Sequence, residues 1–215
     1  MPALISPDRK PRVRRAAYGL ALALLLAGCA TTAPATKHTA GPILQPAEGG
    51  FQLIEGVHVP ADAQADYGNA MRLLNDKQYD QGIPLLITVT AKAPDSAAAY
   101  VDLGIAYSRS GDLDKAEASL KRALELNPRH PVAYNELGLV YRRKGQFALA
   151  RDSYEKALGV FPGFHYARLN LAILCDLYLA DLTCARDNYA AYQQLVPDDK
   201  QVAMWIDNLK SSAQR

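Results

Sequence analysis

The chain has 215 residues, 49% of them hydrophobic and 21% charged, which suffices for one ordinary domain or a short array of repeats and excludes a large multidomain enzyme. Its 24 basic residues exceed its 22 acidic ones, but the first 28 residues hold five basic residues and one acidic residue, which leaves 19 against 21, a net charge of −2. Nucleic-acid binding needs clustered Lys and Arg, so the charge argues against it.

The N-terminus has the parts of a secretory signal peptide in order. Residues 9–15 are basic, and residues 16–27 are uncharged and mostly apolar, a run too short to span a bilayer core of about 30 Å. The sequence LAGC that ends at Cys29 resembles the lipobox of bacterial lipoproteins. We therefore predict a lipoprotein signal peptide over residues 1–28 and lipid attachment, palmitate included, at Cys29.

The lipoprotein resemblance also implies a location. Several acyl chains hold a protein durably on a membrane. In Gram-negative lipoproteins Ala rather than Asp after the lipidated Cys implies sorting to the outer membrane, and residue 30 is Ala. The expected location is the cell envelope, at the periplasmic face of the outer membrane. An ordinary signal peptide or a short buried helix is the alternative.

Residues 29–60 are rich in Thr, Ala, Gly and Pro without a sustained apolar period, which predicts a lipidated flexible tether. An alternative is a short arm that packs on the following domain through its apolar residues, namely Phe51, Leu53, Ile54 and Val57.

From residue 61 the chain repeats itself with a period of 34 residues. Two central copies agree at an aromatic residue, a Leu-Gly pair, a Tyr, a Gly, two Ala and a Pro. They begin Tyr100-x2-Leu103-Gly104-x2-Tyr107 and Tyr134-x2-Leu137-Gly138-x2-Tyr141. A weaker copy covers residues 63–96, and a fourth starts at His165 with one extra residue near Ala180.

These positions strongly resemble the tetratricopeptide repeat, which implies an all-α solenoid of helix-turn-helix hairpins. Apolar residues three and four apart give each helix one face to bury. We expect about four such hairpins over residues 61–197. The apolar face of Val202, Trp205, Ile206 and Leu209 predicts a C-terminal capping helix within residues 198–215.

No pattern of catalytic chemistry is present in the sequence. The four histidines are not spaced with Cys, Asp or Glu as zinc ligands would be, and there is no nucleophile constellation or Gly-rich phosphate loop. The sequence therefore predicts no enzyme, no metal and no cofactor.

In the repeat register Cys175 faces inward on the first helix of the fourth repeat, and Cys184 lies one residue before the inward Ala185 on its second helix. The signal peptide implies export to an oxidising compartment, where an even number of cysteines favours disulfide formation. We therefore predict a disulfide across that hairpin. Two small buried thiols are the alternative.

The resemblance implies a concave groove that binds a protein or peptide, lined by the first helix of each repeat. Carried onto this chain, the groove residues are Val101, Asp102, Ile105, Arg109, Asn135, Glu136, Leu139, Arg142, Arg143, Tyr166, Leu169, Asn170 and Ile173. Asn135 and Asn170 are expected to pair with a ligand backbone. Glu136 and Leu139 replace the Lys and Asn set of chaperone-tail binders, which argues against capture of an acidic C-terminus. Alternatively, residues 43–60 fill the groove.

The resulting hypothesis is a non-enzymatic, lipid-anchored scaffold for protein partners in envelope machinery. Pilus secretin assembly, a TonB-type system and cell-wall machinery are three candidate settings. The alternatives are a periplasmic binder of a soluble ligand such as glycan, and a mainly structural lipoprotein whose groove is filled internally.

Overall fold

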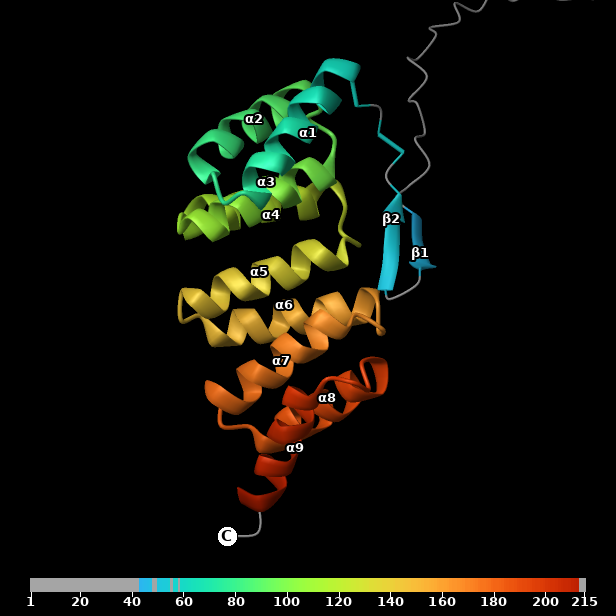
Figure 1. Cartoon of the computed structure of the whole chain (residues 1–215), viewed down its shortest axis with the longest axis vertical. Coiled ribbons are helices and arrows are strands. Elements are labelled where there is room, and N and C mark those ends of the chain that lie inside the picture. Colours follow the sequence, from blue (N-terminus) through green and yellow to red (C-terminus); the bar gives the residue numbers. More distant parts are fainter. Residues whose placement is uncertain (1–42, 48–49, 55, 58, 213–215) are drawn as a thin grey trace, which may run out of the picture. The chain divides into compact units, whose positions relative to one another are not determined.

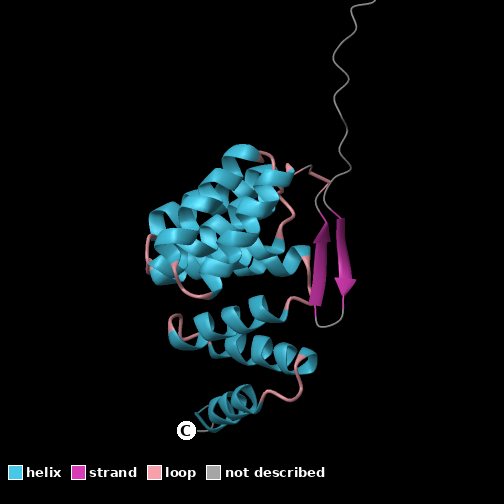
Figure 2. Ribbon diagram, turned by 45° about the horizontal axis from the view of Figure 1, so that its top comes forward, coloured by secondary structure: helices cyan, strands magenta, loops and turns pink. Residues whose placement is uncertain are grey.

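The computed structural model describes residues 43–47, 50–54, 56–57 and 59–212, and from residue 61 onward its elements are helices. In this described part of the chain, four helical pairs are followed by a single helix (Figure 1 and Figure 2). The pairs are α1 (Ala61–Asn75) with α2 (Tyr79–Lys92), α3 (Ala97–Ser110) with α4 (Leu113–Leu126), α5 (Pro131–Arg143) with α6 (Phe147–Val160), and α7 (His165–Leu177) with α8 (Leu182–Leu195); the last helix is α9 (Lys200–Ser212). The expected all-α stack of hairpins is confirmed.

The turn inside each pair places one residue in the left-handed region. These residues are Lys77, Gly111, Gly145 and Ala180, with φ of 60°, 98°, 73° and 53°. The position needs a positive φ to reverse the chain after the first helix, which glycine adopts without steric cost. The first repeat keeps the turn of the central repeats with a lysine at this position, and the fourth places Ala180 there in a turn that is one residue longer.

The two helices of a pair approach closely where the first helix has a small residue. At Gly138 on α5 an added Cβ would lie 2.5 Å from Cε1 of Tyr154 on α6, so no side chain fits there. Leu120, Tyr154 and Tyr189 occupy this inward position in successive repeats and are at most 1% exposed. One column of large side chains thus forms the core of the stack.

Neighbouring pairs pack in chain order, α2 on α3, α4 on α5 and α6 on α7. The first helices also contact one another, α3 with α5 and α5 with α7, which brings them together on one side of the stack. At the end, α9 packs on α8 and buries Val202 and Ile206, while the Trp205 ring lies 5.7 Å from that of Tyr189. This is the arrangement expected of a capping helix.

Part of the predicted tether is ordered as a hairpin. Strands β1 (Ile43–Ala47) and β2 (Gly50–Ile54) pair antiparallel, with Ile43 opposite Ile54 and Ala47 opposite Gly50. The expectation of a structureless tether does not hold for these residues. Two short runs that contain β-branched and aromatic residues flank a Gly-Gly sequence, which is a hairpin signal.

Candidate functional site

The predicted groove residues lie on α3, α5 and α7, the first helices that contact one another. Most are partly or fully exposed: Asp102, Ile105, Arg109, Glu136, Leu139, Arg142, Arg143, Tyr166, Leu169, Asn170 and Ile173. Val101 is the clearest exception, because it is 4% exposed and belongs to the apolar core between pairs. Val101 is therefore a core residue and not a groove residue.

A pocket of about 210 Å³ opens between α1 and α3. Three of its lining residues are predicted groove residues, Asp102, Ile105 and Arg109. The others are Met71, Leu74, Asn75 and Ala106. Sequence reasoning missed the contribution of α1, although a shift of 34 residues from Ile105 and Arg109 leads to Met71 and Asn75.

The wall of this pocket is held by a contact between repeats. The Tyr67 hydroxyl of α1 donates to Oδ2 of Asp102 on α3 at 2.8 Å. Burial and the Asp102 carboxylate both raise the pKa of Tyr67, so the phenol stays protonated and keeps donating. The pocket therefore combines an apolar base with a fixed carboxylate and the exposed Arg109.

Asn135, Asn170 and Glu136 form a hydrogen-bonded row across α5 and α7. Nδ2 of Asn170 donates to Oδ1 of Asn135 at 2.9 Å, and Nδ2 of Asn135 donates to Oε1 of Glu136 at 3.0 Å. Asn135 is only 3% exposed, which corrects the expectation that its amide pairs with a ligand backbone. Burial raises the pKa of Glu136, while the Asn135 hydrogen bond and the nearby Arg109 lower it. The row joins two repeats and leaves Asn170 at the surface.

Two adjacent arginines at the end of α5 have different surroundings. The Arg143 guanidinium donates to the carbonyl of Ser108 and, at 3.1 Å, to its Oγ, so it ties α5 to the end of α3. The Arg142 guanidinium lies 5.9 Å from the ring centroid of Tyr178, and its Nη1 is buried without a hydrogen-bond partner. Arg143 has a structural contact, whereas Arg142 retains unused donors.

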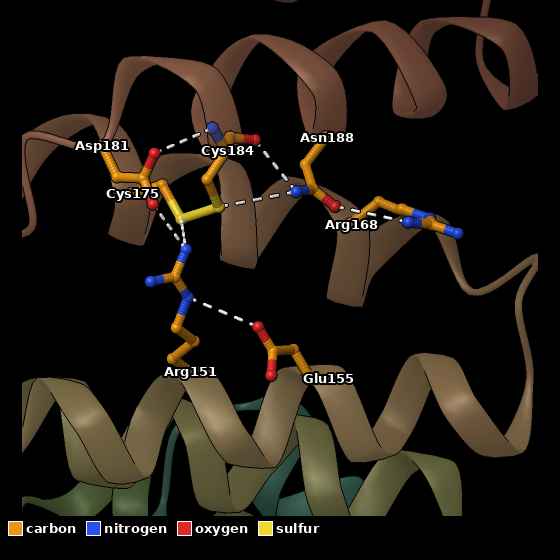
Figure 3. The surroundings of a disulfide bond; sticks show 7 residues. All are labelled: Arg151, Glu155, Arg168, Cys175, Asp181, Cys184 and Asn188. Atoms are coloured by element: carbon orange, nitrogen blue, oxygen red, sulfur yellow. Dashed lines mark hydrogen bonds and ion pairs between the residues drawn. A yellow bond between two sulfur atoms is a disulfide. The ribbon is translucent and has the colours of Figure 1, made fainter.

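The structure joins Cys175 of α7 and Cys184 of α8 in a disulfide, with Cα atoms 5.9 Å apart, as the repeat register predicts. Its surroundings are polar (Figure 3). Arg151 of α6 forms an ion pair with Asp181 at 2.7 Å, and its Nη2 lies 3.7 Å from Sγ of Cys175. Asp181 also caps α8 by accepting from the Cys184 amide at 3.0 Å. The disulfide and the ion pair together fix the longer turn of the fourth repeat.

Within the described ranges one group of side chains has metal-ligating atoms close together, Cys175, Asp181 and Cys184, all within 4.8 Å. The two sulfur atoms are bonded to each other, and Asp181 is paired with the Arg151 cation. In this form the group has no thiolate to offer a metal. The disulfide and the ion pair give these three residues a structural role.

Two sequence models of the tetratricopeptide repeat match the chain, over residues 95–163 and 135–200. Together they span the second, third and fourth helical pairs. The chain is a tetratricopeptide repeat protein. No curated protein sequence matches it significantly.

Solved tetratricopeptide repeat structures resemble this one across most of its length. The protein TTC0263 of Thermus thermophilus has 26% identity and a TM-score of 0.61, covering 70% of this chain and 82% of its own. PilF of Pseudomonas aeruginosa has 17% identity and a TM-score of 0.65, covering 71% and 69%. The first tetratricopeptide domain of Spaghetti, bound to an HSP90 peptide, has 18% identity and a TM-score of 0.53, covering 55% and 94%. These likenesses establish the fold.

Tetratricopeptide repeat proteins are typically scaffolds or adaptors for protein–protein interaction, and this chain has that general architecture. The predicted signal peptide, Cys29 and the tether up to residue 42 lie outside the described residues. Among the helices that are described, none is both long and apolar enough to cross a membrane.

Proposed function

We propose that this protein is a non-enzymatic scaffold, anchored by lipid at Cys29, that binds a protein partner at the concave side formed by α1, α3, α5 and α7. The pocket beside Asp102, Ile105 and Arg109 is the observation that carries the proposal. Its apolar base suits one apolar side chain, and Arg109 and Asp102 at its wall suit polar groups of the partner chain. The same fold in Spaghetti holds an HSP90 peptide, which supports a peptide ligand.

The setting belongs to the same proposal. The LAGC sequence and Ala30 support an anchor at the periplasmic face of the outer membrane. Pilus secretin assembly, a TonB-type system and cell-wall machinery are settings in which a lipid-anchored adaptor of this kind would serve. We infer that the partner belongs to one of them.

The test is affinity capture of the full chain from detergent-solubilised envelopes of its host, followed by mass spectrometry. Arg109 is exposed and lines the pocket, so Arg109→Glu inverts its charge without opening the core. The matched control is Arg186→Glu on α8, where an exposed arginine contacts the adjacent Asp187. A partner recovered with the wild type and the control, and lost with Arg109→Glu, is the expected result.

Recovery of the same proteins with both variants would contradict the groove proposal and favour an internally filled groove. The anchor is tested separately by Cys29→Ser, which should abolish incorporation of labelled palmitate and release the protein from the membrane fraction.

A further inference from the structure

The third and fourth repeats differ at one equivalent pair of residues. In the fourth repeat the Tyr189 hydroxyl donates to Oδ2 of Asp176 at 3.3 Å. The repeat register makes Tyr154 the equivalent of Tyr189 and Arg142 the equivalent of Asp176. The third repeat therefore has a guanidinium, which can only donate, where the fourth has a carboxylate that accepts from the tyrosine hydroxyl.

Neither donor of the third repeat has an acceptor. Tyr154 is 0% exposed, and its hydroxyl has no hydrogen-bond partner. Nη1 of Arg142 is also buried without a hydrogen-bond partner. The Tyr154 ring packs on Gly138, one helical turn before Arg142, and the Arg142 charge lowers the pKa of Tyr154 against the larger effect of burial. The Arg142 guanidinium and the Tyr154 phenol therefore lie near each other. A buried donor without an acceptor is destabilising, so two of them in one repeat call for an explanation.

The carboxylates of Glu136 and Asp176 already accept hydrogen bonds from other residues. Glu136, which also acts on Tyr154, accepts from Asn135 and faces Arg109. Asp176 accepts from Tyr189. Arg142 forms no ion pair within the described ranges. Within the described residues no carboxylate accepts from Arg142 Nη1 or from the Tyr154 hydroxyl.

The side chains beside the Arg142 guanidinium are aromatic. The Tyr178 ring covers the Arg142 guanidinium at 5.9 Å and contacts the Phe147 ring at 5.0 Å, yet Tyr178 is 47% exposed. A carboxylate that reaches Arg142 would carry its neighbouring groups across this aromatic surface, which suits an acidic side chain flanked by apolar residues.

We propose that Arg142 and Tyr154 form a binding site for the carboxylate of an acidic side chain on the protein partner. The carboxylate serves Tyr154 as the Asp176 carboxylate serves Tyr189, accepting from the Tyr154 hydroxyl and from Nη1 of Arg142 while the Tyr178 ring turns aside. The site deepens the proposed function and rests on it, because it assumes a protein ligand.

The test uses two peptide probes, acetyl-Leu-Glu-Leu-amide and acetyl-Leu-Gln-Leu-amide, titrated into the full chain and followed by NMR signals of the arginine and tyrosine side chains. The Glu peptide should perturb Arg142 and Tyr154 and bind about tenfold more tightly than the Gln peptide, since a bond to a charged acceptor is the stronger one. Arg142→Asp reproduces the Tyr189 and Asp176 pair and should fold normally while losing this binding. Tyr154→Phe should weaken it, and Arg186→Gln on α8 should leave it unchanged.

Equal binding of the two peptides, absence of any perturbation, or full binding by Arg142→Asp would overturn the site. So would a crystal structure in which one ordered water accepts from both donors and stays in place with the Glu peptide present. The two proposals fail separately. If Arg109→Glu abolishes envelope capture but the Glu peptide does not bind, only this site is wrong. If the Glu peptide binds but Arg109→Glu captures the same envelope proteins as the wild type, only the groove proposal is wrong.

Discussion

Tyr154 and Tyr189 fill the same core position in consecutive repeats, but only Tyr189 has a hydrogen-bond partner. Tyr189→Phe should therefore lower the free energy of unfolding by about 1 kcal/mol, the net value of one hydrogen bond. Tyr154→Phe removes a hydroxyl with no partner and should leave the peptide-free protein unchanged or slightly more stable. Urea unfolding of the two variants measures this difference. Equal losses in both would mean that Tyr154 has an acceptor after all.

His130 makes the stability of this protein depend on pH. It is 4% exposed, and its Nδ1 caps α5 by accepting from the Ala133 amide at 3.2 Å, which requires the neutral ring. Burial lowers its pKa from 6.5 to about 4. Between pH 6.5 and 4 the His130 ring is protonated in the unfolded chain but neutral in the folded chain. The contribution of His130 to the free energy of unfolding is therefore complete above pH 6.5 and is lost as the pH falls towards 4.

The loss over that window should be about 3 kcal/mol for this residue. It is measured by urea unfolding at a series of pH values. His130→Asn keeps an N-cap acceptor that does not titrate and should flatten the profile between pH 6.5 and 4 by that amount. An unchanged profile in the variant would assign the dependence to other groups.

At the scale of elements, the turn between α7 and α8 is the one that departs from the repeat pattern. It carries one extra residue, and the amide of Asp181 donates back to the Cys175 carbonyl at 2.9 Å. The disulfide closes a loop with a sequence separation of 9 residues and joins the end of α7 to the first turn of α8. The fourth hairpin is therefore held by a covalent bond where the central two have tight Gly turns.

Reduction of this disulfide should lower the free energy of unfolding by about 3 kcal/mol, because the unfolded chain regains the entropy of the open loop. Thermal unfolding with and without dithiothreitol measures the change. Cys184→Ala is the control, since the reductant should then have no effect. A wild type that is insensitive to reductant would show that the Arg151–Asp181 ion pair and packing suffice.

At the scale of the whole stack, the main contacts between the described helical pairs join neighbours in chain order, so we expect stability to be transmitted locally. The end of such a stack is exposed unless something covers it. Val202 and Ile206 of α9 provide that cover over α8, whereas Met204 on the same helix is 64% exposed.

Ile206→Asp should therefore unfold α9 and loosen α8 while leaving α1 to α4 intact, because burial of an unpaired charge is costly and its effect stays near the end. Hydrogen exchange followed by mass spectrometry should show lost protection over residues 182–212 and normal protection over residues 61–126. Met204→Asp is the matched control and should change neither region. Uniform loss of protection in Ile206→Asp would mean that the stack unfolds as one unit.

The sequence alone predicted the helical pairs, because the 34-residue period records which faces must be buried and where small residues allow close approach. It predicted the pairing of Cys175 and Cys184 for the same reason, since the register places Cys175 inward and Cys184 beside the inward Ala185 on the two helices of one hairpin. It missed the β1–β2 hairpin, because the Thr, Ala, Gly and Pro content of this segment predicts a flexible tether. It also missed the role of α1 in the pocket, because the weaker first copy hid the equivalence of Met71 and Asn75 to groove positions.

Only the tertiary structure decided which groove positions are available to a partner. Val101 is buried between hairpins, Asn135 bonds to Asn170, and Arg143 bonds to Ser108. These contacts join residues of adjacent repeats, about one period apart in sequence. A repeat pattern fixes the position of each side chain on its own helix. Whether the polar atoms of that side chain find hydrogen-bond partners depends on how the next repeat packs. The unpaired donors of Arg142 and Tyr154 are therefore visible only in three dimensions.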